Sequence, residues 1–209
     1  HSCKLHLEII HNNFKQTPLN PNVKKEYIFI YIIFAILLLL GIFFDDYIVT
    51  GVVSNRIPIL NEFMTWVSYG GTWFVVLVVM TSLFLWSERK RKWILPLWLN
   101  LGISALITKI IKLIIVRDRP YLALGFEALS EAAGSSFPSG HATAVFSTLA
   151  VLDKEFPKFK WFWLVFAALV AFSRIYLGVH YLSDVVVGGI IGLTAGLFII
   201  YFWKIKKSF

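Results

Sequence analysis

The amino-acid composition separates this chain from ordinary water-soluble domains. Of its 209 residues, 58% are hydrophobic and 15% are charged, and the formal net charge is +8. Soluble domains carry roughly 45–50% apolar and about 25% charged residues. This composition therefore excludes a single water-soluble core and favours membrane-spanning segments. The basic residues are then expected in loops at a membrane surface, and no nucleic-acid partner is expected.

The length of the chain corresponds to one domain. We assign residues 1–22 to a leader of uncertain structure and residues 23–209 to a single transmembrane domain. The one cysteine, Cys3, supplies neither an intrachain disulfide framework nor a cysteine-based metal site.

Six apolar segments are long enough, or can be extended far enough, to form transmembrane helices, which need about 20 residues each. Charged or polar stretches separate them. The sequence therefore predicts an all-α fold, a bundle of six transmembrane helices. The predicted spans are residues 27–44, 72–86, 93–116, 142–152, 161–172 and 185–203.

A weaker apolar pattern lies between the first two spans. Its apolar residues recur close to helical spacing, and the polar residues fall largely off that stripe. We interpret residues 47–67 as a helix that lies on the membrane surface. An ordinary loop with one helical turn is the alternative. The apolar positions are Val49, Val52, Val53, Ile57, Leu60, Met64 and Val67.

The distribution of Lys and Arg predicts the orientation of the bundle. Basic residues gather in loops 87–92 and 153–160 and near both ends of the chain. With six spans these regions all lie on one side, which is expected to be cytoplasmic. The extracytoplasmic side has few basic residues, and these need another explanation: Arg56, Arg117, Arg119 and Arg174.

Ionisable residues cluster at the extracytoplasmic ends of the spans, where they are costly and typically functional. Lys112 and Arg119 are seven residues apart, which places them on one side of a helix that Pro120 ends. Ser173 and Arg174 close the fifth predicted span.

The fourth and sixth spans begin with further reactive groups. Ser139, Gly140 and His141 stand at a helix start, where free N–H groups bind anions. His180 and Asp184 are four residues apart, so that on a helix they can form a hydrogen bond.

This set of side chains suits phosphoryl transfer. Three cations would neutralise phosphate oxygens, and the N–H groups near Ser139 would complete the anion site. One histidine would attack phosphorus while the other protonates the leaving oxygen, and Asp184 would hold the His180 ring in its reactive tautomer. No set of carboxylates or thiols resembles a metal site, so neither a metal nor another cofactor is expected.

The same residues resemble the three signatures of the type 2 phosphatidic acid phosphatase (PAP2) family, which includes membrane lipid phosphatases. The resemblance covers about residues 60–200 and implies six transmembrane helices and a metal-independent mechanism. The signatures are Lys112-LIIVRD-Arg119-Pro120, Pro138-Ser139-Gly140-His141 and Ser173-Arg174-IYLGV-His180-YLS-Asp184.

The resemblance also implies roles for individual residues. His180 would be the nucleophile that forms a phosphohistidine, His141 the general acid, and Asp184 the partner of His180. The implied phosphate-binding residues are Lys112, Arg119, Ser139, Gly140 and Arg174.

The leading hypothesis is a lipid phosphate phosphatase at the outer face of the cell membrane. Its substrate would be a polyprenyl diphosphate such as undecaprenyl diphosphate, or else phosphatidate or phosphatidylglycerophosphate. A transporter or flippase for anionic lipids is the alternative from another functional class. The oligomeric state stays open. Arg117 and Asp118 are interpreted as an ion pair at a solvated corner.

Overall fold

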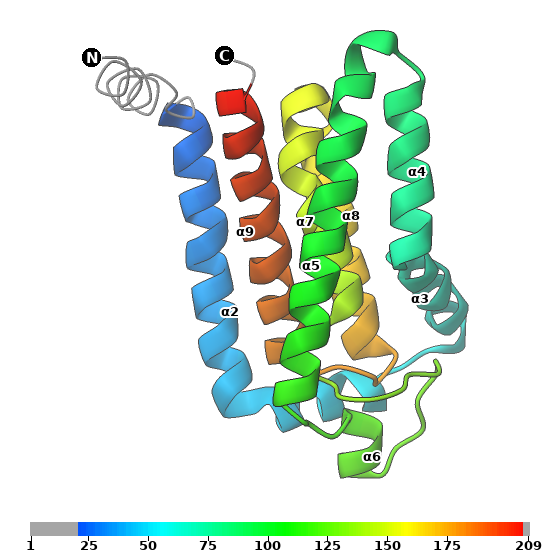
Figure 1. Ribbon diagram of the computed structural model, residues 1–209. Helices are drawn as coiled ribbons and strands as arrows, with labels where there is room; N and C mark the ends of the chain where they lie inside the picture. Colours follow the sequence, from blue (N-terminus) through cyan, green and yellow to red (C-terminus); the bar gives the residue numbers. More distant parts are fainter. Residues whose placement is uncertain (1–20, 207–209) are drawn as a thin grey trace, which may run out of the picture.

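The computed structural model describes residues 21–206, so the first twenty residues of the predicted leader lie outside the described part. Within that part the chain forms helices, turns and loops without any strand, which confirms the all-α prediction. Long helices run side by side in one bundle (Figure 1). They are α2 (Pro21–Ser54), α4 (Trp73–Leu85), α5 (Ile94–Ile114), α7 (Gly140–Glu155), α8 (Lys160–Tyr176) and α9 (Leu182–Lys206).

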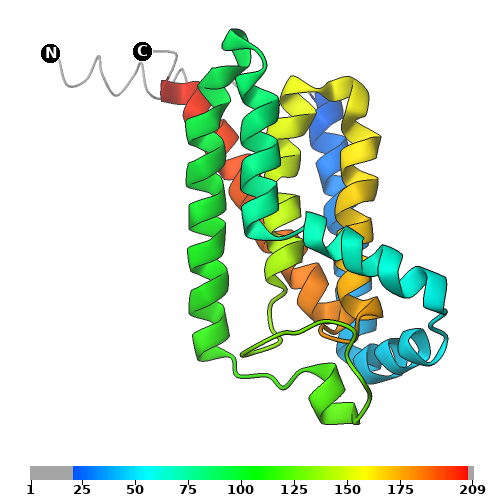
Figure 2. The same ribbon diagram turned by 90° about the vertical axis from the view of Figure 1, so that its right-hand side faces the viewer.

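Shorter elements connect these helices. The helix α3 (Pro58–Gly70) precedes α4, and α6 (Pro120–Leu124) lies in the long loop between α5 and α7. Two 3₁₀ turns, η1 (Glu88–Trp93) and η2 (Pro157–Phe159), lie at the end of the bundle that also holds the start of α2 and the end of α9 (Figures 1 and 2).

Each of the predicted spans coincides with one long helix, but not all of these helices are long enough to cross a membrane unaided. By length and composition, four described stretches qualify: Lys25–Ser54, Glu88–Ile114, Pro157–Tyr176 and Leu182–Trp203. The pair α3 and α4, bent by 64°, makes a fifth if it is counted as one span. The total of six spans stays a prediction.

The segment predicted as one surface helix, residues 47–67, is divided in the structure. The helix α2 kinks at Phe44 (φ −131°, ψ 16°) and continues to Ser54 across the end of the bundle (Figure 1). A break follows because Pro58 forces Ile57 into an extended conformation (φ −125°, ψ 141°), and α3 then begins. The prediction of one continuous helix is therefore wrong, and its position at the membrane surface stays a prediction.

The helix α7 is the centre of the bundle. It packs most extensively against α9 and also contacts α8, α5 and α4. Every residue from Ala142 to Leu152 is buried. The hydroxyls of Ser147 and Thr148 donate to carbonyl oxygens one turn earlier, at 2.8 and 2.9 Å. The neighbouring helices bury the side chains of α7, and its hydroxyls bond to its own backbone carbonyls. The helix therefore does not need an apolar surface that faces lipid.

Glycines on α9 allow its close approach to α7. A Cβ atom added at Gly192 would lie 2.3 Å from the Thr143 carbonyl oxygen, and one at Gly188 would lie 2.5 Å from that of Ser139. No side chain fits at such distances, so only glycine permits this packing. The contact brings the first turns of α7 and α9 together at one end of the bundle.

Candidate active site

The predicted site residues meet at the end of the bundle opposite the start of α2. At that end α7 and α9 begin, α8 ends and the chain leaves α5 (Figures 1 and 2). The loops 115–139 and 177–181 close it. Side chains from all three sequence signatures are thereby brought into one neighbourhood.

His180 lies in the turn before α9 and is only 3% exposed. Its Nδ1 atom is 3.3 Å from Oδ2 of Asp184, and its Nε2 atom is 3.4 Å from Nη1 of Arg119. When Nδ1 carries the proton and donates to Asp184, the lone pair of Nε2 faces the Arg119 N–H and accepts from it. The predicted contact between His180 and Asp184 thus exists, although His180 precedes the helix instead of lying on it.

The fold keeps the His180 ring neutral. Burial is the largest influence and lowers the pKa of His180 from 6.5 to about 4. The hydrogen bond and charge of Asp184 oppose this shift, while the charges of Arg174 and Arg119 add to it. Since the pKa is lowered, the ring is unprotonated at pH 7 and takes up a second proton only as the pH falls through about 4.

Asp184 is fully buried and accepts from several donors. Its Oδ2 atom receives the Tyr181 backbone N–H at 2.9 Å and the Ser136 hydroxyl in addition to His180. The N–H of Tyr181, the residue before α9, is thereby satisfied by an acidic residue of the first turn, as in a capping box. These bonds fix the carboxylate beside the imidazole.

Ser139 precedes the first residue of α7, and its hydroxyl is buried without a hydrogen-bond partner. The hydroxyl does not cap the helix. The backbone N–H of Ser139 donates to the Asp184 carbonyl oxygen at 2.9 Å, so it is not available to an anion as predicted. Gly140 and His141 are in the first turn, where N–H groups lack intrahelical acceptors. The serine hydroxyl and these two N–H groups are therefore the available donors.

His141 is half-buried at the second residue of α7. Four groups act electrostatically on its ring: Arg174, His180, Arg119 and Lys112. The structure thus brings the two histidines and the three predicted cations close together.

Arg174 is 4% exposed and comes from the last turn of α8. Its Nη1 atom donates to the Ser68 hydroxyl on α3, whereas its Nε atom is buried without a partner. A buried guanidinium donor that is not hydrogen-bonded is costly unless a ligand satisfies it.

Arg119 and Lys112 both donate to loop carbonyls in this structure. Arg119 contacts the carbonyl oxygens of Ala133 at 2.8 Å, Gly134 at 3.0 Å and Val179 at 2.9 Å. Lys112 donates to the carbonyl oxygen of Ser135. These cations hold the loop that leads into α7, and Nη1 of Arg119 also faces His180.

The predicted geometry of Lys112 and Arg119, two turns apart on one helix, is wrong. The helix α5 ends at Ile114, and Pro120 begins α6 instead of ending α5. The Ser135 hydroxyl donates to the Ile115 carbonyl oxygen at 2.7 Å and accepts the Arg117 N–H at 3.2 Å, which satisfies the backbone beyond the helix end. Arg119 reaches the site from an extended loop.

The predicted ion pair between Arg117 and Asp118 is also wrong. Arg117 binds Oδ1 of Asp184 at 2.8 Å and Oδ2 of Asp45 at 2.9 Å, while Asp118 is exposed. Sequence reasoning missed Asp45 because it lies 72 residues from Arg117. The only feature of the sequence that pointed to Asp45 was its position directly after an apolar span.

The arrangement combines a neutral imidazole, a second imidazole among cations and unpartnered buried donors. These donors and cations are groups of the kind that bind a tetrahedral anion. Among residues 21–206, no group of three or more His, Cys, Asp or Glu side chains is placed to hold a metal ion.

Comparison with known proteins identifies the same region. The family described as the PAP2 superfamily matches residues 93–208. An undecaprenyl-diphosphatase of Sulfolobus acidocaldarius is 33% identical over 141 residues, 66% of this chain and 68% of the relative. Phosphatidylglycerophosphatase B of Bacillus subtilis is 35% identical over 162 residues, 71% of this chain and 78% of the relative.

Solved structures share the fold. The PAP2-type phosphatidylglycerolphosphate phosphatase from Bacillus subtilis superposes with a TM-score of 0.68 at 27% identity, over 84% of this chain and 94% of that one. Aquifex aeolicus LpxE also gives 0.68, at 29% identity, over 74% of this chain and 93% of that one.

Proposed function

Because the chain belongs to the PAP2 superfamily, we propose that it is an integral-membrane lipid phosphate phosphatase that works through a phosphohistidine at the extracytoplasmic membrane face. The observation that carries this proposal is the buried pair of His180 and Asp184 beside unpartnered donors of Ser139 and Arg174. A binding site for a transported lipid would not need a carboxylate that orients an imidazole.

The first step transfers the phosphoryl group to the enzyme. Nε2 of His180 attacks phosphorus, and the bond from phosphorus to the lipid oxygen breaks. His141, as imidazolium, gives its proton to that oxygen, so a lipid alcohol or a lipid monophosphate leaves. Asp184 holds the Nδ1 proton of His180 and stabilises the charge on the phosphorylated ring.

The second step releases phosphate. His141, now neutral, removes a proton from water, and the resulting oxygen attacks phosphorus. The bond from phosphorus to Nε2 breaks, which returns His180 to its starting form. The fixed donors stabilise the transition state of both steps, and such preorganised donors are usually the largest catalytic contribution.

The phosphate site would use Ser139, Gly140, Lys112, Arg119 and Arg174. The Ser139 hydroxyl and Nε of Arg174 are free of protein partners, and Nη1 of Arg119 lies close to His180. Lys112 would exchange a loop carbonyl for a phosphate oxygen. No metal ion or cofactor is required in this scheme.

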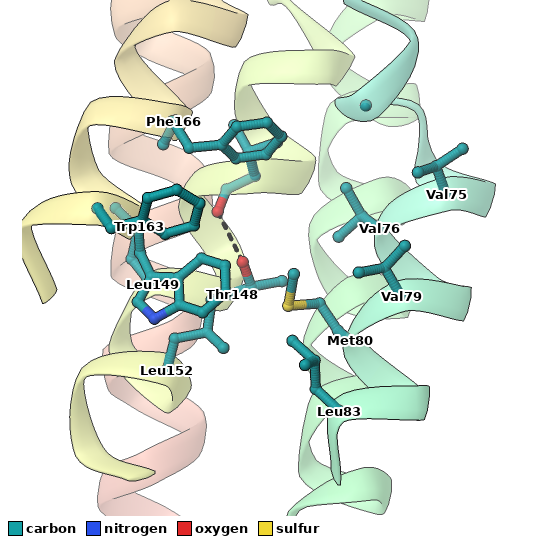
Figure 3. Close-up of a pocket in the computed structure, with 14 residues that line it drawn as sticks. Val75, Val76, Val79, Met80, Leu83, Thr148, Leu149, Leu152, Trp163 and Phe166 are labelled. Atoms are coloured by element: carbon teal, nitrogen blue, oxygen red, sulfur yellow. Dashed lines mark hydrogen bonds between the residues drawn. The ribbon is translucent and has the colours of Figure 1, made fainter. Parts of the chain in front are cut away.

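An apolar cavity that begins one turn from His141 and runs along the bundle away from the site supports a lipid substrate. It has a volume of about 400 Å³ and lies between α4, α7 and α8 (Figure 3). Its wall includes Val76, Met80 and Trp163, and the Thr148 hydroxyl is turned to its own helix backbone (Figure 3). Val145, one turn after His141, also lines it. A hydrocarbon chain in this cavity would keep its phosphate at the start of α7.

Two substrate groups fit this arrangement. The relatives are named for undecaprenyl diphosphate and for phosphatidylglycerophosphate, so the shared chemistry is a phosphate or diphosphate ester of a lipid. We propose undecaprenyl diphosphate first, with phosphatidate or phosphatidylglycerophosphate as the alternative.

We also propose six membrane spans with both chain ends in the cytoplasm. The helix α7 can cross the membrane despite its polar residues because other helices surround it. The end with η1 carries Arg89, Lys90, Arg91 and Lys92, as expected for a cytoplasmic surface, and the site lies at the opposite end.

Purified protein tests the activity directly. In excess EDTA, the wild type should release phosphate from a panel of lipid phosphates and diphosphates, and His180→Ala should lower kcat by about 10³-fold or more, as loss of a catalytic nucleophile does. Lys112→Ala should also lose activity, whereas Lys109→Ala, an exposed lysine on the same helix, serves as its matched control. Hydrolysis that persists in His180→Ala, or that EDTA abolishes, would contradict the mechanism.

A further inference from the structure

A buried ionic network links the first helix of the chain to the candidate nucleophile. Arg117 bridges two carboxylates, with Nη1 2.8 Å from Oδ1 of Asp184 and Nη2 2.9 Å from Oδ2 of Asp45. Asp45 is 8% exposed and lies on α2 just past the kink at Phe44. The kink therefore turns a residue outside the three signatures toward the site.

The start of α9 closes this network. The backbone N–H of Ser183 donates to Oδ1 of Asp45 at 3.0 Å, and the Ser183 hydroxyl contacts the same carboxylate. Arg117 donates to that hydroxyl at 2.7 Å, and its guanidinium lies 3.9 Å from the centre of the Tyr181 ring. Arg117 is thus held on one side by Asp45 and Ser183 and on another by an aromatic face.

The two oxygens of Asp184 have separate partners. Oδ1 accepts from Arg117, and Oδ2 faces His180. A fully buried carboxylate is costly without a compensating charge, and Arg117 supplies one on the side away from the imidazole. Burial acts to lower the pKa of Arg117, but the nearby charge of Asp184 and the hydrogen bond of Asp45 outweigh it and raise the pKa above its ordinary value. Arg117 therefore stays charged.

We propose that Arg117 and Asp45 are positioning residues for the nucleophile: Arg117 holds Oδ1 of Asp184 so that Oδ2 orients the His180 ring, and Asp45 holds Arg117. This inference rests on the proposed role of His180. Arg117 does not act on the phosphate itself, because its terminal nitrogens are engaged with the two carboxylates and with Ser183.

Removal of the Arg117 charge has a defined consequence for His180. Asp184 would then be less neutralised and would favour the protonated imidazolium, so His180 would bind a proton at a higher pH. The other groups that act on the ring, Arg119 and Arg174, are unchanged by this substitution. His141 and Lys112, which share the site, are also unchanged.

The test compares full-length wild type with Arg117→Gln, Arg117→Lys and Asp45→Asn, purified in detergent without substrate. Titration of the ¹⁵N-labelled imidazole of His180, followed by NMR, should move to higher pH by about one unit in Arg117→Gln, as expected for loss of a nearby charge. Arg117→Lys keeps the charge and should titrate close to wild type. Asp45→Asn removes a negative charge and leaves Arg117 charged, so its titration should not move to higher pH, and its effect is expected in kcat through the looser hold on Arg117.

Kinetics on a lipid phosphate separate positioning from phosphate binding. Arg117→Gln should lower kcat by about 10- to 100-fold, the loss typical when a partner that orients a reacting histidine is removed. KM should stay within about threefold, and Arg117→Lys should recover part of kcat. A raised KM with unchanged kcat would instead make Arg117 a phosphate ligand and overturn the proposal, as would an unchanged titration of His180.

The exposed neighbours provide matched controls. Asp46→Asn and Asp118→Asn make the same chemical change beside the network and should behave as wild type. If Arg117→Gln does not fold, the proposal is tested with Arg117→Lys and Asp45→Asn. An unchanged kcat in both of these variants overturns it. If the wild type hydrolyses no lipid phosphate, the proposed function fails, whereas the NMR titration still tests the network.

Discussion

At the residue scale, the fold gives the two imidazoles of the site different surroundings. His180 is buried against Asp184, whereas His141 begins α7 half-buried, where the charges of Arg174, Arg119 and Lys112 act on it. Burial, followed by those cations, lowers the pKa of His141, and a bound phosphate dianion would offset the cations and act to raise it again. In the proposed mechanism His180 attacks phosphorus and His141 donates the proton.

The proposed role of His141 predicts a dependence on the leaving group. His141→Gln should lower kcat for a lipid phosphate by about 10²- to 10⁴-fold, the usual contribution of a general acid. It should have much less effect on p-nitrophenyl phosphate, whose leaving oxygen needs no proton. Steady-state rates with both substrates measure this, and His180→Ala, which should lose both activities, is the control. Equal losses on both substrates would argue against a proton donor.

The sequence could predict which residues meet at the site but not how they are held. The signatures lie at the ends of apolar segments, so their convergence at one end of a bundle follows from alternating helix direction. The geometry of Arg119 could not be predicted, because the Ile115 carbonyl at the end of α5 is bound by Ser135, a residue twenty positions away. The partners of Arg117, Asp45 and Asp184, could not be predicted either, because they too are distant from it in the sequence.

At the scale of elements, the contact between α7 and α9 depends on glycine. Gly192→Ala should destabilise the protein because the added Cβ would meet the Thr143 carbonyl oxygen at 2.3 Å. Overpacking of this kind costs about 1–3 kcal/mol. Thermal unfolding in detergent measures the loss. Gly102→Ala is the control, since a Cβ at that position meets nothing within 4 Å. Equal unfolding temperatures for Gly192→Ala and Gly102→Ala would mean that α7 and α9 can move apart at little cost.

The cavity between α4, α7 and α8 predicts selectivity for chain length. Val79→Trp should fill it and raise KM for a long-chain lipid phosphate by about tenfold, the cost of about 1.4 kcal/mol of lost apolar contact. A short-chain substrate should be unaffected. Ala168→Trp enlarges a side chain in a second apolar cavity, between α2, α8 and α9, and is the matched control. A larger effect from Ala168→Trp would place the lipid chain in that second cavity.

The positions of the long helices could be predicted because long apolar runs determine them. The breaks and kinks within helices were harder to predict. The break before α3 has a local cause in Pro58, but the kink at Phe44 has none in the neighbouring sequence. That kink accompanies the bonds of Asp45 to Ser183 and Arg117, which only the folded chain brings together. The polar residues of α7 likewise made its apolar run look short.

At the scale of the whole molecule, charge distribution and architecture predict one orientation in the membrane. Single cysteines introduced at exposed positions into a Cys3→Ala protein test it. Glu131→Cys, in the loop whose Ala133 carbonyl accepts from Arg119, should react with a membrane-impermeant maleimide in intact cells. Arg89→Cys, in η1 at the other end, should react only after permeabilisation. The reverse labelling pattern would place the site in the cytoplasm.

The tight contact between α7 and α9 has a mechanical consequence. His141 is carried by α7, and His180 directly precedes α9, while the Ser139 N–H also ties the two helix starts together. The two imidazole rings are therefore carried by one tightly packed pair of helices. The bend between α3 and α4, at Gly70 and Gly71, lies outside this pair. That bend is itself packed tightly, since a Cβ atom at Gly71 would lie 2.2 Å from Cγ1 of Val170 on α8. The separation of the two histidine rings is therefore expected to stay constant when an amphiphile binds.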